Sequence, residues 1–283
     1  MVGITIGMIV LVLLVMIPAS FKFVALGKPK TRQTVGALEP ADQIPTIFLP
    51  GYFGNRFSFG RLLNRLSLRY QANKSMVVRV DLHGRIRIRG TISQSRPMIQ
   101  VLFANKLSRP EQQATWLADI CRALHDRYGV NQVNLVGHSM GCITIFWFLT
   151  HQSATSMVTV KRVVAIAGPF NDSEIARRTS DIDAYPLNAK GPVKKMPIYR
   201  ALSKRVFAIP KGIQVLNIAG RISNLQQDDG QVSLNSAFSL RYLLRAPVEQ
   251  YRELVIHGKR ATHRLLHENS EVDEGIAKFI WNL

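Results

Sequence analysis

The chain has 283 residues, which is enough for one large domain and an additional segment. Hydrophobic residues make up 47% and charged residues 19%, a balance that is typical of a globular protein and excludes a disordered one. Lys and Arg number 37 against 18 Asp and Glu, and the formal net charge of +19 favours anionic partners such as lipid head groups or phosphate-rich wall polymers. The basic residues are scattered and form no recognisable nucleic-acid-binding module, so we expect no nucleic acid partner.

An almost unbroken hydrophobic run covers residues 2–24, with its first charge at Lys22. The run is long enough for a transmembrane helix and longer than the usual core of a signal peptide, so residues 1–26 are predicted to be an N-terminal transmembrane anchor or uncleaved signal. Basic residues follow the run and none precedes it, which by the positive-inside rule would leave the remainder of the chain in the cytoplasm. Residues 27–43, mostly polar and small, predict a linker, and residues 44–283 a single domain.

Apolar runs typical of strands alternate with amphipathic helical patterns through this domain. Strands are predicted at 45–49, 76–80, 84–91, 98–103, from 133 to the turn before Ser139, and at 160–167, 212–219 and 251–257. Helices are predicted at 57–70, 110–128, 143–149 and 271–283, and residues 240–245 are predicted to be the end of a further helix. This alternation implies an α/β fold with a mostly parallel sheet flanked by helices, in which the strand at 84–91 pairs with its predecessor as a hairpin.

The segment at 168–204 contains four prolines and mixed charges. It is too long for a simple loop, so we interpret it as a cap over the pocket.

The predicted helix at 57–70 carries Arg61, Arg65 and Arg69 along one side and apolar residues at helical spacing on the other. Because charged rows on surface helices are usually solvated, we interpret the three arginines first as a solvent-exposed stripe and second as an anion site.

The segment at 133–142 carries the chemistry. An apolar run rich in β-branched residues ends in Gly137-His138-Ser139-Met140-Gly141, and a strongly apolar segment follows. This order predicts a strand, a sharp turn and a helix, with Ser139 at the apex, although an ordinary strand-to-helix turn is the alternative. Glycine is needed on both sides because the serine backbone is strained and a side chain there would strike the strand or the helix. Ser139 is therefore the candidate nucleophile, with a helix N-terminus to stabilise developing negative charge.

A serine hydroxyl needs a base and an orienting acid to act as a nucleophile, and in this fold the chain order is Ser, acid, His. The polar loop at 220–233 offers Asp229, followed by a glycine that lets the loop turn, with Asp228 as the substitute and a plain Asp-Gly turn as the alternative. The loop after the last strand offers His263 as the base, while His267, one helical turn further on, could pack or cap instead. His138, inside the turn, is interpreted as a supporting residue.

The sequence predicts neither a metal nor another cofactor. A zincin motif would need Glu directly after His263, where Arg264 stands. The two cysteines, Cys121 and Cys142, lie in apolar helical contexts without metal-ligand spacing, which predicts two buried free thiols.

A glycine-rich loop at 50–55 follows the first strand of the domain, where a hydrolase of this type supplies an oxyanion donor from a backbone N–H. Together with the serine turn, several further segments carry a family resemblance, namely Pro97-Met98-Ile99-Gln100-Val101, Gly168-Pro169-Phe170-Asn171, Asp229-Gly230-Gln231-Val232, and His263 with His267-Glu268-Asn269. On these motifs the chain resembles the alpha/beta-hydrolase superfamily from about residue 45 to its C-terminus. More narrowly, it resembles an uncharacterised family of Gram-positive cell-surface hydrolases with an N-terminal membrane anchor.

The resemblance implies Ser139, Asp229 and His263 as a catalytic triad, with the backbone N–H groups of Tyr52 and Met140 as oxyanion donors. Such families usually carry His-Gly in the oxyanion loop, whereas here a proline precedes the glycine. The N–H that this proline lacks is not one of the implied donors. The resemblance also implies an extracytoplasmic catalytic domain, in contrast to the charge count around the hydrophobic run.

The sequence thus predicts a membrane-anchored serine hydrolase that cleaves a small or lipid-like carboxylic ester by acyl transfer. A peptidase or thioesterase would use the same triad. A hypothesis of a different class is a membrane-tethered basic binding protein on a hydrolase scaffold, attached to anionic wall polymers or lipids, because a fold does not imply an activity.

Overall fold

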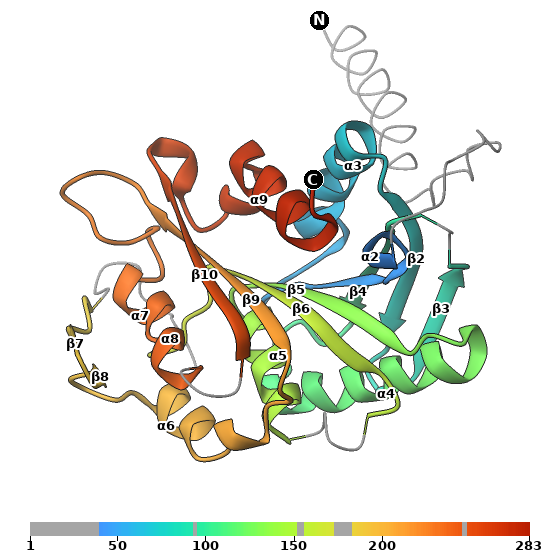
Figure 1. Cartoon of the computed structure of the whole chain (residues 1–283), viewed down its shortest axis with the longest axis horizontal. Helices are drawn as coiled ribbons and strands as arrows, with labels where there is room; N and C mark the ends of the chain where they lie inside the picture. The colour runs from blue at the N-terminus through green and yellow to red at the C-terminus, as the bar shows by residue number, and fades with distance from the viewer. Residues whose placement is uncertain (1–39, 93–94, 152–155, 173–182, 245–247) are drawn as a thin grey trace, which may run out of the picture.

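In the computed structural model, eight strands form one central sheet in the order β10-β9-β6-β5-β1-β4-β2-β3 (Figure 1). The structure describes residues 40–92, 95–151, 156–172, 183–244 and 248–283. The strands are β1 (Thr46–Leu49), β2 (Asn73–Val80), β3 (Ile86–Gly90), β4 (Pro97–Phe103), β5 (Gln132–His138), β6 (Thr159–Ile166), β9 (Ile213–Arg221) and β10 (Val248–His257). Every pairing is parallel except the antiparallel pairing of β3 with β2. The predicted α/β fold with a mostly parallel sheet, and the predicted hairpin, are confirmed.

Helices cover both faces of the sheet (Figure 1). On one face lie α3 (Arg56–Tyr70) and α9 (Ser270–Trp281), and on the other α4 (Pro110–Tyr128) and α5 (Met140–His151). Successive residues of a strand point to opposite faces, so Ile47 packs with the side chains of α4 and α5 while Phe48 packs with those of α3 and α9. The inner strands are therefore mostly apolar, as expected for a sheet buried on both faces.

The ends of the long helices follow from local chemistry. The Asn55 carboxamide oxygen accepts a hydrogen bond from the Phe57 N–H at 2.8 Å, and the Ser58 hydroxyl accepts one from the Asn55 N–H at 3.0 Å, which forms a capping box at the start of α3. Helix α4 begins at a proline and ends at Gly129, whose φ of +66° suits glycine. Both helices begin and end within one residue of their predicted bounds.

Shorter elements connect this framework. They are α2 (Pro40–Gln43), β7 (Leu187–Asn188), β8 (Gly191–Pro192), α6 (Pro197–Ser203), η2 (Val206–Ala208), α7 (Leu234–Phe238), α8 (Leu240–Leu243), η3 (Lys259–Ala261) and η4 (Leu266–Glu268). The segment at 168–204, interpreted as a cap, contains the two-stranded β7–β8 sheet and α6 where it is described. The helix end predicted at 240–245 is the separate short helix α8.

The predicted solvent-exposed arginine stripe on α3 is wrong at Arg65. Its guanidinium donates to both carboxylate oxygens of Asp273 at 2.5 and 2.9 Å, to Glu268 at 3.0 Å and to the carbonyl oxygen of His267 at 3.0 Å. Arg65 therefore joins α3 to α9 and η4, whereas Arg61 and Arg69 are exposed as predicted. A charge at helical spacing cannot show whether an acid from a distant segment lies opposite.

The predicted anchor at 1–26 and residues 27–39 of the predicted linker lie outside the described residues. The last four linker residues form α2, where Asp42 is buried and accepts two hydrogen bonds from Arg96, at 2.9 and 3.0 Å. Within the described ranges, every helix is too short or too polar to cross a membrane.

Candidate active site

Ser139 lies in the turn between β5 and α5. Its φ of +55° falls in the left-handed region, which residues other than glycine rarely adopt. Two backbone hydrogen bonds of 2.9 Å hold it there: its N–H donates to the Ile166 carbonyl, and its carbonyl accepts from the Cys142 N–H. A strained serine between a strand and a helix has the geometry of a nucleophile elbow.

Three glycines make room for this turn. A Cβ on Gly137 would lie 2.8 Å from the Cys142 nitrogen, and one on Gly141 would strike the carbonyl oxygen of the last residue of β1. The predicted need for glycine on both sides of Ser139 is confirmed. A Cβ on Gly51 would lie 2.9 Å from the Ser139 Cβ, so the loop after β1 packs directly against the elbow.

Asp229 and His263 form a buried pair. The Asp229 Oδ2 lies 2.8 Å from the His263 Nδ1, and its Oδ1 accepts hydrogen bonds from the N–H groups of Gln231 and Val232 at 2.9 and 2.7 Å. The backbones are also joined, because the His263 N–H donates to the Asp229 carbonyl at 2.7 Å. With Nδ1 against a carboxylate, Nδ1 carries the ring proton and Nε2 is the nitrogen that can accept another.

Asp228 makes hydrogen bonds within its own loop. Its Oδ1 accepts a hydrogen bond from the Gly230 N–H at 2.8 Å, and its carbonyl accepts one from the Ile222 N–H at 3.1 Å. Its side chain therefore shapes the loop, and Asp229 is the acid that meets the histidine.

His138 connects the elbow to the segment that carries His263. The His138 Nε2 lies 2.9 Å from the His263 carbonyl oxygen and must donate to it, because a carbonyl only accepts. Burial holds the pKa of His138 well below its usual range, and the nearby His263 and His267 lower this pKa further, so the ring stays neutral. Among the described residues no hydrogen bond joins the Ser139 hydroxyl to the His263 ring. His138, the residue before Ser139, contacts the segment of His263 through its hydrogen bond to the His263 carbonyl and through its ring, whose centroid lies 4.8 Å from that of His263. The sequence could not show this contact, because its partners are 125 residues apart.

His267 packs. Its ring lies edge-on to His138, with centroids 4.9 Å apart, and is tilted against the Phe59 ring at 6.2 Å. Burial lowers the pKa of His267 to about 4, so the ring is uncharged at neutral pH. Of the two roles that the sequence left open for His267, the structure shows packing, while His263 is the histidine that contacts the acid.

The two segments predicted to supply the oxyanion donors lie beside each other. Met140 is the first residue of α5, so its N–H has no partner within the helix. The loop after β1 turns sharply, with the Gly54 N–H donating to the Gly51 carbonyl at 3.1 Å, and Tyr52 directly follows the glycine that packs on the elbow. The Cβ position of Gly51 is 3.4 Å from the Met140 nitrogen, which brings the two segments together.

Both cysteines are buried and free, as predicted. Within the part of the chain that the structure describes, no three His, Cys, Asp or Glu side chains form a group that could hold a metal ion.

A family model described as alpha/beta hydrolase of unknown function (DUF915) matches residues 35–283. A comparison with curated proteins finds no match.

Several solved structures are similar. The product of the gene lin2722 from Listeria innocua is 28% identical, with 86% of this chain and 95% of that chain covered and a TM-score of 0.77. A proposed cell surface hydrolase from Lactobacillus plantarum WCFS1 is 24% identical, with coverage of 84% and 92% and a TM-score of 0.68. The mature lipase BlEst2 from Bacillus licheniformis is 16% identical, with coverage of 88% and 96% and a TM-score of 0.51, and this likeness is one of fold.

Proposed function

The chain belongs to this family of alpha/beta hydrolases, and we propose that it is a serine hydrolase that cleaves a carboxylic ester by acyl transfer. One arrangement carries the proposal: the buried Asp229–His263 pair, joined through His138 to the strained turn of Ser139. A histidine held by a buried carboxylate and packed against the residue before a serine elbow supports a site in which that histidine activates the hydroxyl.

In the proposed mechanism, the His263 Nε2 takes the proton of the Ser139 hydroxyl while the Ser139 Oγ attacks the ester carbonyl carbon. The N–H groups of Tyr52 and Met140 donate to the oxyanion, and Asp229 stabilises the imidazolium. The bond to the alcohol oxygen then breaks, and the alcohol leaves with the proton from His263. A water molecule, deprotonated by His263, attacks the acyl-enzyme and releases the carboxylic acid, which restores the serine.

The proposed substrate is a small or lipid-like ester. An ester is cleaved more readily than an amide by these groups, because an alcohol is a better leaving group than an amine. We propose that the segment at 168–204 covers the bound acyl group as a cap.

A fluorophosphonate probe tests the proposal, because it reacts covalently with activated serines. The full chain in non-ionic detergent should be labelled and should hydrolyse p-nitrophenyl esters, with Ser139→Ala losing both properties. Ser223→Ala, which changes an exposed serine in the loop after β9, is the matched control and should keep both. An unlabelled wild-type chain, or labelling that persists in Ser139→Ala, would contradict the proposal.

We also propose that residues 1–26 anchor the chain with its catalytic domain outside the cytoplasm. Since both native cysteines are buried, a cysteine placed at Leu225, which is 96% exposed, gives a single reactive thiol. A membrane-impermeant maleimide should label Leu225→Cys in intact cells. Labelling only after lysis would instead support the cytoplasmic orientation.

A further inference from the structure

Four large apolar side chains in the segments that carry the candidate site are exposed. Phe53 is 68% exposed, Leu107 54%, Phe57 40% and Leu265 38%. Single exposed apolar residues are ordinary, but a group of them around one site calls for a partner. We refer to these four residues as the apolar rim.

The rim residues belong to segments that meet at the elbow. Phe53 is two residues beyond Gly51, which packs on Ser139, and its N–H donates to the Lys106 carbonyl at 3.0 Å, beside Leu107. Leu265 is two residues beyond His263. These segments follow the carboxyl ends of β1, β4 and β10, which lie at the same edge of a parallel sheet.

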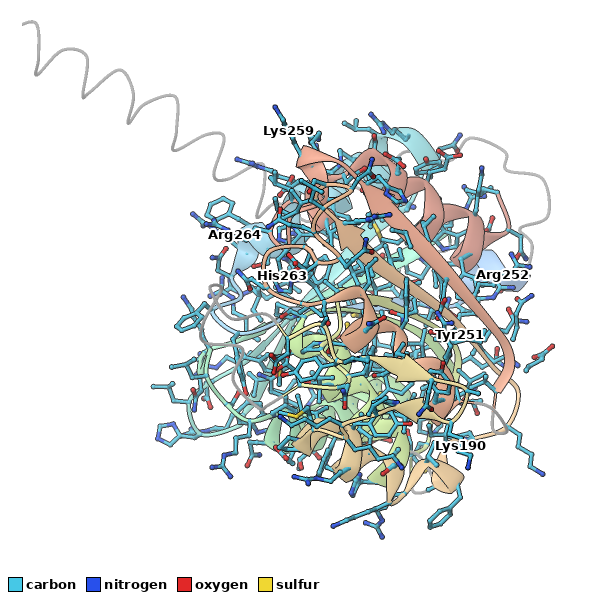
Figure 2. All side chains as sticks on the ribbon, turned by 90° about the vertical axis from the view of Figure 1, so that its left-hand side faces the viewer. Lys190, Tyr251, Arg252, Lys259, His263 and Arg264 are labelled. Carbon is cyan, nitrogen blue, oxygen red and sulfur yellow. The ribbon has the colours of Figure 1, made fainter. Side chains whose placement is uncertain are left out.

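Each of three rim residues directly follows a cation. The pairs are Arg56-Phe57, Lys106-Leu107 and Arg264-Leu265. The Arg56 guanidinium lies 4.7 Å from the centre of the Phe57 ring, while Lys106 and Arg264 are exposed. Figure 2 shows Arg264, and also Lys259 of η3, on the side of the molecule that carries His263.

Three acids near the site are already engaged. Asp229 contacts His263, Asp228 accepts the Gly230 N–H, and Glu268 pairs with Arg65. Among the described residues, neither Lys106 nor Arg264 lies within ion-pair distance of a carboxylate. These segments thus combine exposed apolar side chains with two cations, Lys106 and Arg264, that make no ion pair among the described residues.

We propose that the apolar rim and its cations dock the candidate site onto the surface of an anionic lipid layer. Apolar side chains enter the boundary between head groups and acyl chains, while Lys and Arg remain at the phosphates. An acidic protein would need a shaped, polar counterpart to the rim, whereas a lipid surface accepts scattered apolar side chains of uneven height. The proposal deepens the proposed function, on which it rests for the ester, by making a lipid in that layer the substrate class.

Site-specific fluorescence tests the docking. Leu107→Cys and Met157→Cys are each introduced into the full chain and labelled with a polarity-sensitive NBD maleimide, since the native cysteines are buried. Met157 is the matched control because it is 58% exposed and precedes β6, at the opposite edge of the sheet. With vesicles of equimolar phosphatidylcholine and phosphatidylglycerol, the dye at position 107 should shift to the blue and brighten severalfold, and the dye at position 157 should change little.

The comparison of the two labelled variants removes the contribution of residues 1–26, because attachment through them alone would affect both dyes alike. Lys106→Glu combined with Arg264→Glu should raise the vesicle concentration needed for the fluorescence change at position 107 by at least about tenfold. Replacement of the mixed vesicles by vesicles of phosphatidylcholine alone should raise it by a similar factor. Equal responses at both positions, or no response at position 107, would overturn the proposal. So would a response to soluble polyglutamate that matches the response to vesicles, since it would identify a polyanion site.

The outcome is separable from that of the proposed function. The dye responses are measured in the Ser139→Ala background, where no catalysis is expected. Docking without fluorophosphonate labelling of the wild-type chain would reject the hydrolase and keep the lipid surface. Fluorophosphonate labelling without docking would support the hydrolase and reject the lipid surface.

Discussion

Asp228 and Asp229 are neighbours in the chain but differ in what they contact. Asp229 is 2% exposed, and its carboxylate accepts two backbone N–H groups and meets the His263 ring, whereas the Asp228 carboxylate accepts the Gly230 N–H. Asp229→Asn should therefore lower kcat for ester hydrolysis by about 10³- to 10⁴-fold, because an amide in this place favours the wrong histidine tautomer. Asp228→Asn should stay within about threefold of the wild type. Equal losses in the two variants would remove Asp229 from the mechanism.

His267 should make the fold sensitive to acid. Its pKa of about 4 in the folded protein lies below its ordinary value of 6.5 because the ring is buried. Between these values the unfolded chain binds more protons than the folded one, so the stabilisation is fully present above about pH 6.5 and is lost as the pH falls toward 4. Buried His138, whose pKa is also lowered, acts in the same direction.

The prediction is that His267→Phe loses less stability between pH 7 and pH 5 than the wild type, by about 1–2 kcal/mol in urea unfolding. His257→Phe, at an exposed site, is the control and should follow the wild-type pH dependence. Identical pH dependence in His267→Phe and the wild type would show that the ring titrates normally.

At the scale of elements, one arginine holds α3 to the C-terminal part of the chain. Asp273 is fully buried, and burial raises its pKa even though Arg65 stabilises its carboxylate. Arg65→Met should leave that carboxylate without its partner and lower the free energy of unfolding by about 3–5 kcal/mol. Arg61→Ala, one turn earlier on the exposed side, should change it by less than about 0.5 kcal/mol.

Chemical denaturation of both variants provides the measurement, and the double variant Arg65→Met with Asp273→Leu supplies the decisive comparison. Replacement of a buried ion pair by apolar residues is often nearly neutral, so the double variant should recover most of the loss. No recovery would mean that Arg65 acts through Glu268 and the His267 carbonyl instead.

For the whole molecule, the net charge of +19 is the dominant electrostatic property. Self-repulsion of this excess destabilises the compact state and is screened by salt. Raising NaCl from about 0.05 M to about 0.3 M should therefore raise Tm by a few degrees, measured by scanning calorimetry of the full chain in non-ionic detergent. Sucrose at equal osmolarity is the control for general solute effects. A Tm that falls with salt would show that local ion pairs, such as that of Arg65, outweigh the repulsion.

The sequence by itself determined the framework. Strand and helix periods are local properties, so the mostly parallel sheet, the helix at 110–128 and the hairpin at 84–91 were all readable from neighbouring residues. The elbow was readable from its sequence motif, and the requirement for Gly137 is local because its Cβ would strike the turn itself, whereas the requirement for Gly141 comes from the backbone of β1, about 90 residues earlier.

Only the tertiary structure decided among groups of the same kind. The choice of Asp229 over Asp228 depends on the contact of Asp229 with His263, 34 residues away. The contact of His138 with His263 spans 125 residues, and that of Arg65 with Asp273 spans 208. A sequence pattern records what a side chain can donate or accept, but which partner stands opposite is set by how distant segments pack. Burial follows from the same packing. It lowers the pKa of His267 and keeps that ring neutral, whereas the packing of His263 places its ring in contact with Asp229.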